Sequence, residues 1–98
     1  RFLCAGSVVI DTESRTVTRD GAEVSLTLKE YEMLLLFVRN PGVALYRETI
    51  YERVWDEPYY GDTRTVDLHV QRLRKKLNLS DEIQSVYKIG YRFKADDL

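Results

Sequence analysis

The sequence predicts an α+β domain, and three observations indicate it. Residues 1–26 contain short β-favouring runs separated by turn signals, as in an antiparallel sheet. The middle of the chain places apolar residues at the spacing of amphipathic helices. The last part returns to two short β-favouring runs around a tight turn. At 98 residues the chain is long enough for one hydrophobic core, so we expect a single domain over residues 1–98.

The N-terminal sheet is expected to have four antiparallel strands. Asp20-Gly21 lies between two β-favouring runs, and both residues tolerate the positive φ of a two-residue hairpin turn. The expected strands are residues 2–4, 7–10, 16–18 and 23–25. Cys4, the only cysteine, lies in the first strand and is interpreted as a small core residue. One cysteine allows no internal disulfide, and with a single histidine in the chain we predict no metal site and no cofactor.

The first helix is predicted over residues 28–40. Thr27 and Glu30 have the spacing of a capping box, in which each side chain accepts a hydrogen bond from the other residue's backbone N–H. The apolar face comprises Tyr31, Leu34, Leu35 and Val38, widened by Met33, Leu36 and Phe37. A helix this apolar belongs at the centre of the core. Pro41 and Gly42 end it, because proline cannot continue the hydrogen-bond ladder.

Beyond the first helix, we expect a short strand at residues 43–45 and a second helix at residues 47–54. Residues 55–63 follow and are rich in Pro, Gly, Tyr and acidic side chains, which predicts a loop between two helices. Two interpretations of this loop stay open. It is either a plain connector whose tyrosines pack on the core, or a surface that exposes Tyr59 and Tyr60.

The third helix is predicted over Arg64–Leu77 and is two-sided. One side carries the apolar residues Val66, Val70, Leu73 and Leu77, and the opposite side carries Arg64, Leu68, Gln71, Arg72 and Lys75. The segment holds five Arg or Lys against a single acid, Asp67. Asp62 or Thr63 is expected to cap its N-terminus. A packed back with a basic, amide-bearing front suits a DNA major groove, although a solvated basic face is the simpler interpretation of such a helix taken alone.

A β-hairpin is predicted after the third helix. Its strands are expected at residues 83–87 and 91–94, around a tip formed by Lys88-Ile89-Gly90. Gly90 is expected to supply a positive φ. Residues 95–98 then form a short acidic tail.

The charge of the chain is polarised. Residues 1–63 carry seven Lys or Arg and eleven Asp or Glu, whereas residues 64–98 carry eight and five. Local potential, rather than the net charge of −1, steers a polyanion over a Debye length of about 8–10 Å. No apolar run approaches the roughly 20 residues that cross a bilayer, and the N-terminus lacks the pattern of a signal peptide. Because the first residue is Arg1 rather than Met, we expect a domain excised from a longer protein.

The order of elements favours DNA binding over the simpler interpretation of the third helix. Two helices, a loop and a third helix followed by a hairpin make a helix-turn-helix with a β-hairpin wing. The basic helix and the wing, with Lys88 at its tip, match adjoining grooves of B-DNA. A winged domain that binds protein without DNA is the alternative. The sequence shows no nucleophile–base pair, metal cluster or phosphate loop, so we do not expect an enzyme.

These residues resemble a known family, the OmpR/PhoB-type response-regulator output domain. The run Arg64–Leu77 and the later Gly90-Tyr91-Arg92-Phe93 carry the resemblance. Supporting matches are Leu26-Thr27-Leu28-Lys29-Glu30-Tyr31 at the first helix, and Arg47-Glu48 with Val54-Trp55 around the second. The resemblance covers essentially the whole chain and implies a winged helix-turn-helix fold with an N-terminal four-stranded sheet.

The resemblance also implies the biological setting. It implies a bacterial, cytoplasmic transcription factor of a two-component phosphorelay, from which an N-terminal receiver domain is absent here. The implied partners are double-stranded DNA bearing tandem direct repeats, RNA polymerase, the protein's own receiver domain and a sensor histidine kinase. Off DNA, the isolated domain is expected to be a monomer, with no membrane partner.

Carried over residue by residue, the resemblance assigns roles within the site. Base contacts are implied for Leu68, Arg72 and Arg74, the last of which reaches a base or a phosphate. DNA backbone contacts are implied for Trp55, Arg64, His69, Gln71, Lys75 and Lys88. The surface that meets RNA polymerase is implied for the loop residues Asp56, Glu57, Tyr59, Tyr60 and Asp62. The wing, residues 87–91, is implied to lie on the adjacent groove or backbone.

The sequence departs from the family pattern at two positions. Tyr87 stands where the family's wing often carries an arginine that enters the minor groove, so a phosphate contact by Lys88 is expected instead. Gln71 stands where an arginine is common, which removes a cation from the helix.

Three of the site residues have structural alternatives that stay open, and Asp67 beside them has a structural role alone. His69 is either a phosphate donor or a partly buried structural histidine, and Trp55 either contacts phosphate or covers the core. Asp67 is expected to pair with Arg74 or Arg64 and hold the helix. Leu68 either meets a thymine methyl group or is simply an exposed leucine.

Overall fold

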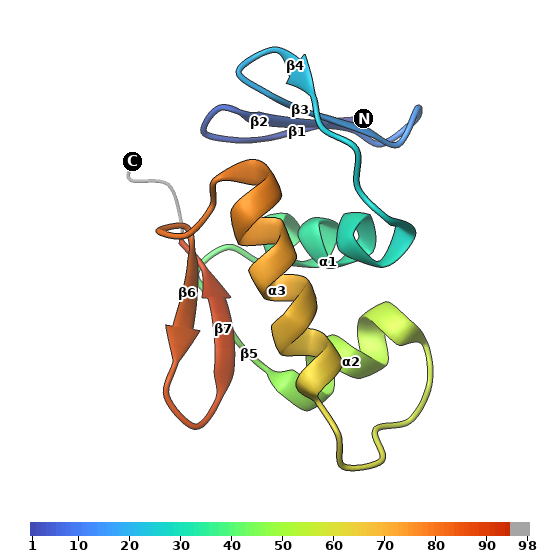
Figure 1. The fold of residues 1–98 in the computed structure, drawn as a ribbon, viewed down its shortest axis with the longest axis vertical. Coiled ribbons are helices and arrows are strands. Elements are labelled where there is room, and N and C mark those ends of the chain that lie inside the picture. The colour runs from blue at the N-terminus through green and yellow to red at the C-terminus, as the bar shows by residue number, and fades with distance from the viewer. Residues whose placement is uncertain (95–98) are drawn as a thin grey trace.

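The computed structural model of the protein describes residues 1–94 and contains two antiparallel sheets and three helices within them (Figure 1). In chain order the elements are β1 (Phe2–Ala5), β2 (Val8–Asp11), β3 (Thr16–Arg19), β4 (Ala22–Glu23), α1 (Leu28–Arg39), β5 (Ala44–Tyr46), α2 (Arg47–Trp55), α3 (Arg64–Leu77), β6 (Ile83–Val86) and β7 (Gly90–Phe93). The predicted fold class is therefore confirmed. The predicted acidic tail, residues 95–98, lies outside the described residues.

The N-terminal sheet is a simple meander in the order β1-β2-β3-β4. Asp20 and Gly21 both have positive φ, 51° and 82°, as the hairpin prediction requires. This turn pairs Arg19 with Ala22, so β4 begins one residue earlier than expected. The prediction for Cys4 was wrong, because the pleat of β1 turns Cys4 outward and exposes it to solvent.

Helix α1 lies at the centre of the core, between the N-terminal sheet and α2 and behind α3 (Figure 1). Its capping box is present: Thr27 Oγ1 accepts from the Glu30 N–H at 3.2 Å, and Glu30 Oε1 accepts from the Thr27 N–H at 2.9 Å. Met33, Leu34 and Phe37 are fully buried. The helix that sequence reasoning placed at the centre therefore occupies it.

Helix α3 crosses α1 and presents its length along one side of the molecule (Figure 1). All four residues of the predicted apolar stripe, Val66, Val70, Leu73 and Leu77, are fully buried. At the start of the helix, Asp62 Oδ1 accepts from the Arg64 N–H at 3.0 Å, whereas the Thr63 side chain makes no cap bond. At the other end, Asn78 takes the left-handed conformation with φ 53°.

The wing is a three-stranded sheet in the order β5-β7-β6. The short strand that follows α1 pairs with the last strand of the hairpin, so that Leu45 lies opposite Tyr91. The prediction for Gly90 was wrong, because Lys88 takes the positive φ, 63°, and Gly90 does not. Glycine is required at position 90 for a different reason. A Cβ there would collide with the Leu45 carbonyl oxygen and lie 3.0 Å from the Arg47 backbone nitrogen.

Candidate nucleic-acid interface

The exposed face of α3 carries the side chains that the sequence pattern placed there. Arg64, Leu68, Gln71, Arg72 and Lys75 are all exposed. Leu68 is 48% exposed and is the apolar member of this face. The exposed face of α3 therefore combines three cations, an amide and one apolar side chain. Each chemical type needed to read base edges, thymine methyl groups and phosphates is present.

Arg74 lies at the seam between α3 and the wing. Its Nε donates to the Ile83 carbonyl oxygen at 3.0 Å, and Nη2 donates to that oxygen and to Ser85 Oγ at 3.1 Å. The guanidinium also lies over the Tyr91 ring, 5.5 Å from its centroid. These contacts give Arg74 a positioning role that the sequence pattern did not indicate. Its predicted contact with DNA stays a prediction.

Asp67 was expected to pair with Arg74 or Arg64, and it pairs with neither. Asp67 Oδ1 accepts from Arg47 Nε at 2.9 Å and from the Tyr91 hydroxyl at 2.6 Å. The bond to Asp67 raises the pKa of Arg47. Burial, followed by the bond to Asp67, raises the pKa of Tyr91. One carboxylate on α3 therefore ties together the start of α2 and the central strand of the wing.

The two arginines that Asp67 was expected to bind have other partners. Arg74 is held by the wing, and Arg64 makes two bonds to Asp62, from Nε at 3.1 Å and from Nη2 at 2.9 Å. The hydrogen bonds from Arg64 lower the pKa of Asp62 to about 2. Asp62, predicted as a loop residue facing a partner, thus also caps α3 and holds one of its exposed cations.

His69 and Trp55 meet at the contact between α3 and α2. The His69 ring stands edge-on to Trp55 with centroids 4.9 Å apart, and Trp55 stacks on Tyr51 at 5.3 Å. His69 Nδ1 lies 2.7 Å from the Thr65 carbonyl oxygen. Because that oxygen only accepts, Nδ1 carries the proton and Nε2 is the ring nitrogen left for another partner. Both side chains are partly exposed, so each retains surface for a phosphate contact.

The loop between α2 and α3 is folded back on α2. The Tyr51 hydroxyl donates to Glu57 Oε1 at 2.8 Å, and the Tyr59 N–H donates to Glu52 Oε2 at 3.1 Å. Tyr59 packs edge-on against Tyr51, whereas Tyr60 is 83% exposed. Tyr59 therefore packs on α2, whereas Tyr60 is presented to solvent.

The tip of the wing projects Tyr87 into solvent with Lys88 beside it. Tyr87 is 86% exposed, and Lys88 Nζ lies 5.5 Å from the centroid of its ring. Figure 1 shows this tip beyond the N-terminal end of α3, on the side of the molecule where the wing runs along the helix.

An ion pair between Lys76 and a buried carboxylate anchors the other end of α3. Glu30, fully buried, accepts from Lys76 Nζ at 2.7 Å across the contact between α1 and α3. Burial acts to raise the pKa of Glu30, but hydrogen bonds from Lys76 and the Thr27 N–H together with the Lys76 charge outweigh it and lower the pKa. Sequence reasoning found the capping role of Glu30 and missed Lys76, because the pair is separated by 46 positions.

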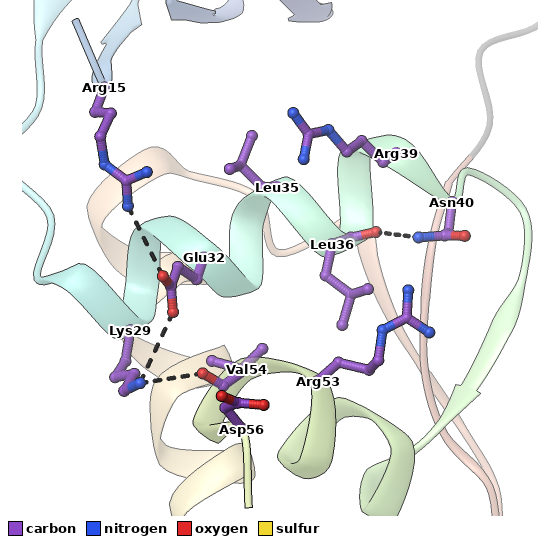
Figure 2. A pocket seen from close by; sticks show the side chains of 10 residues that line it. All are labelled: Arg15, Lys29, Glu32, Leu35, Leu36, Arg39, Asn40, Arg53, Val54 and Asp56. Carbon is purple, nitrogen blue, oxygen red and sulfur yellow. Dashed lines mark hydrogen bonds and ion pairs between the residues drawn. The ribbon is translucent and has the colours of Figure 1, made fainter. Parts of the chain in front are cut away.

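A groove of about 750 Å³ lies between α1, the end of α2 and the β2–β3 turn (Figure 2). Glu32 lies between Arg15 and Lys29, 3.8 Å from each, and Lys29 also donates to the Val54 carbonyl oxygen. No residue of α3 or the wing lines this groove. The groove is therefore separate from the candidate interface, and contacts within the fold pair three of its charged side chains, Arg15, Lys29 and Glu32.

Two further kinds of site are not found in the described part of the chain. Among residues 1–94, no three His, Cys, Asp or Glu side chains gather closely enough to hold a metal ion. No helix in the same range has the length and apolar content to cross a membrane.

Comparison with known proteins establishes the family. Residues 21–93 match the family model described as transcriptional regulatory protein, C terminal. The chain is 48% identical over 93 residues to the transcriptional regulatory protein CseB of Streptomyces avermitilis, and 44% identical over 91 residues to ResD of Bacillus subtilis. These matches cover 95% and 88% of the chain, but only 39% and 38% of the two relatives. The chain therefore spans about two fifths of the length of these curated relatives.

Solved structures give the same result for the fold. The DNA-binding domain of Klebsiella pneumoniae RstA, in complex with the RstA box, superposes with a TM-score of 0.85 at 30% identity, covering 96% of this chain and 97% of that one. The DNA-binding domain of Bacillus subtilis CssR superposes with a TM-score of 0.80 at 36% identity, covering 89% and 99%. The fold and the exposed basic helix define a winged helix-turn-helix domain. This chain belongs to the family of C-terminal domains of OmpR/PhoB-type transcriptional regulators.

Proposed function

We propose that this domain binds double-stranded DNA sequence-specifically and thereby regulates transcription. The observation that carries the proposal is the exposed face of α3, with its three cations, an amide and Leu68 above a fully buried back. The similar RstA domain, whose structure is a complex with the RstA box, supports it. An α-helix of this kind fits the major groove, and a hairpin tip bearing Lys88 fits the adjoining groove or its backbone.

Base recognition is assigned to Leu68, Arg72 and Arg74. Arg72 is exposed and free to form the bidentate hydrogen bonds that an arginine makes to guanine O6 and N7. Leu68 offers apolar contact to a thymine methyl group. Arg74 reaches DNA only from its place at the wing seam, so its contact is expected at the edge of the recognised site.

Backbone contacts are assigned to side chains that surround this reading face. Arg64, Gln71, Lys75 and Lys88 supply cations and an amide, Trp55 supplies its indole N–H, and His69 supplies Nε2 when protonated. Such contacts fix the register of the protein on DNA without reading sequence, and they make affinity fall with salt.

The wider setting is proposed from the family. In the whole protein, this domain follows a receiver domain that a sensor histidine kinase phosphorylates, and pairs of domains occupy direct repeats in the bacterial cytoplasm. The loop residues Asp56, Glu57, Tyr59, Tyr60 and Asp62 contact RNA polymerase. The domain itself acts by binding and is not an enzyme.

The test is selection of bound sites from random duplex DNA. An enriched motif is expected, with binding of the winning duplex weakening linearly in a plot of log affinity against log salt. Absence of any enriched motif would favour a winged domain that binds protein and would overturn the proposal.

A further inference from the structure

An unbroken line of aromatic rings runs from α3 to the loop between α2 and α3. His69 meets Trp55 edge-on at 4.9 Å, and Trp55 stacks on Tyr51 at 5.3 Å with the ring planes 8° apart. Tyr51 then meets Tyr59 edge-on at 6.4 Å. The four side chains come from three successive elements, so the line joins the candidate DNA face to the loop.

Hydrogen bonds hold two of the four rings, those of His69 and Tyr51. On α3, the His69 ring is held by its bond to the Thr65 carbonyl oxygen. On the loop side, the Tyr51 hydroxyl holds Glu57 at 2.8 Å. The line thus places Trp55 between His69 and Tyr51, and Tyr51 contacts the loop through both its ring and its hydroxyl.

We propose that Trp55 and Tyr51 are positioning residues that couple DNA contact at α3 to the conformation of loop residues 56–63. This inference rests on the proposed function for its DNA partner. Phosphates that bind Trp55 and His69 restrict both rings, and the stack passes this restriction to Tyr51 and the loop. By thermodynamic reciprocity, a partner that binds the loop in its packed conformation strengthens DNA binding by the same factor.

The variants separate ring stacking from the hydroxyl bond. Tyr51→Leu removes the ring and the hydroxyl, whereas Tyr51→Phe keeps the ring and removes the bond to Glu57. Tyr46→Leu is the matched control, because Tyr46 is a 53% exposed tyrosine at the opposite end of α2. All variants are first checked for cooperative unfolding.

The first arm of the experiment uses no DNA. Hydrogen exchange is measured at the backbone amide of Tyr59, the loop amide that donates to Glu52 Oε2. The substitution His69→Ala is expected to accelerate exchange there by about fivefold in the wild-type background, and to have no further effect in Tyr51→Leu. Equal acceleration in both backgrounds, or none in the wild type, would overturn the coupling.

The second arm adds the duplex enriched from random DNA, with binding followed by the emission of Trp55, the only tryptophan in the chain. DNA is expected to slow loop exchange about fivefold in the wild type and in Tyr46→Leu, but not in Tyr51→Leu. Tyr51→Phe is expected to keep most of the slowing. Loss in Tyr51→Phe equal to that in Tyr51→Leu, or full slowing in Tyr51→Leu, would overturn the stack as the route. If no duplex binds, the proposed function fails, and the first arm alone decides the coupling.

Discussion

The two ends of α3 are held by carboxylates of opposite character. Asp67, near the N-terminal end, is partly exposed, and one of its oxygens is bonded to both Arg47 and Tyr91. Glu30 meets the C-terminal end through Lys76 and is fully buried, and within residues 1–94 its Oε2 accepts no hydrogen bond. The first contact orients α3 relative to the wing, and the second fixes α3 against the core.

Because of this difference, we expect one end of α3 to contribute mainly to stability and the other mainly to DNA recognition. A buried charge that loses its partner is costly, because the protein interior cannot replace the lost solvation. A half-exposed carboxylate that loses one of two partners keeps the other and regains water. We therefore expect the Glu30 end to dominate the free energy of unfolding, and the Asp67 end to affect how the wing and α3 meet DNA together.

The largest expected effect is from Lys76→Met. It leaves the buried Glu30 carboxylate without its cation and should lower the free energy of unfolding by about 2–3 kcal/mol, less than for a fully buried pair because Lys76 is partly exposed. Denaturant unfolding measures this. The control is Lys75→Met, an exposed neighbour expected to change stability by less than about 0.5 kcal/mol. Equal stabilities of the two variants would show that the Glu30 end does not dominate.

The next effect concerns the reading face between the two ends. Arg72→Ala should weaken binding to the selected duplex by about 1–3 kcal/mol and relax the preference at one base pair, with stability unchanged. Lys75→Ala is the matched cation, and it should weaken binding on all sequences and reduce the salt slope by about one unit. Titration of single-base variants distinguishes them. Unaltered preference in Arg72→Ala would remove its base-reading role.

A smaller effect is expected at the Asp67 end from Tyr91→Phe. The substitution removes one hydroxyl from a buried ring and leaves Asp67 bonded to Arg47, so unfolding should become easier by about 1–2 kcal/mol. Tyr87→Phe, at the exposed wing tip, is the control and should be neutral. If Tyr91→Phe lowered the free energy of unfolding as much as Lys76→Met does, the two ends of α3 would not differ in their contribution to stability.

The pH dependence of stability sharpens the comparison further. Because the pKa of Glu30 is lowered in the folded state from its ordinary value of 4.5, its contribution is fully present above that value and is lost as pH falls through the folded pKa. Wild type should therefore lose more stability than Glu30→Gln as pH falls below about 4.5. Unfolding curves at several pH values measure this. Parallel losses in both proteins would mean that Glu30 is not the group responsible.

The smallest expected effect on DNA binding comes from the loop. Tyr60→Ala should reduce transcription from a cognate promoter while leaving DNA affinity within about twofold, because Tyr60 is highly exposed and belongs to the loop and not to α3. Reporter activity and duplex binding are compared on the same variant. Matching losses in both assays would contradict the polymerase contact.

Much of the fold follows from local patterns. The capping box at Thr27 and Glu30, the Asp20-Gly21 turn and the apolar stripe of α3 all act between residues close in sequence. The errors share the opposite cause. Whether Cys4 faces the core depends on which side of β1 is covered, and the conformation of Gly90 depends on the approach of β5 from elsewhere in the chain.

The candidate site divides in the same way. Helical periodicity is enough to place Arg64, Leu68 and Arg72 on an exposed face. Periodicity carries no information on the partners of Asp67 and Arg74, because each partner belongs to another element at a separation of 9 to 24 positions.

The sequence by itself determined the order and approximate bounds of the helices and strands, and which face of α3 is buried and which is exposed. It did so because capping, turn and periodicity signals act over a few residues. Only the tertiary structure decided how α3 is held: by Arg47 and Tyr91 through Asp67 at one end, and by Glu30 through Lys76 at the other. Side-chain hydrogen bonds between elements depend on the packing of the whole core, which local spacing does not encode.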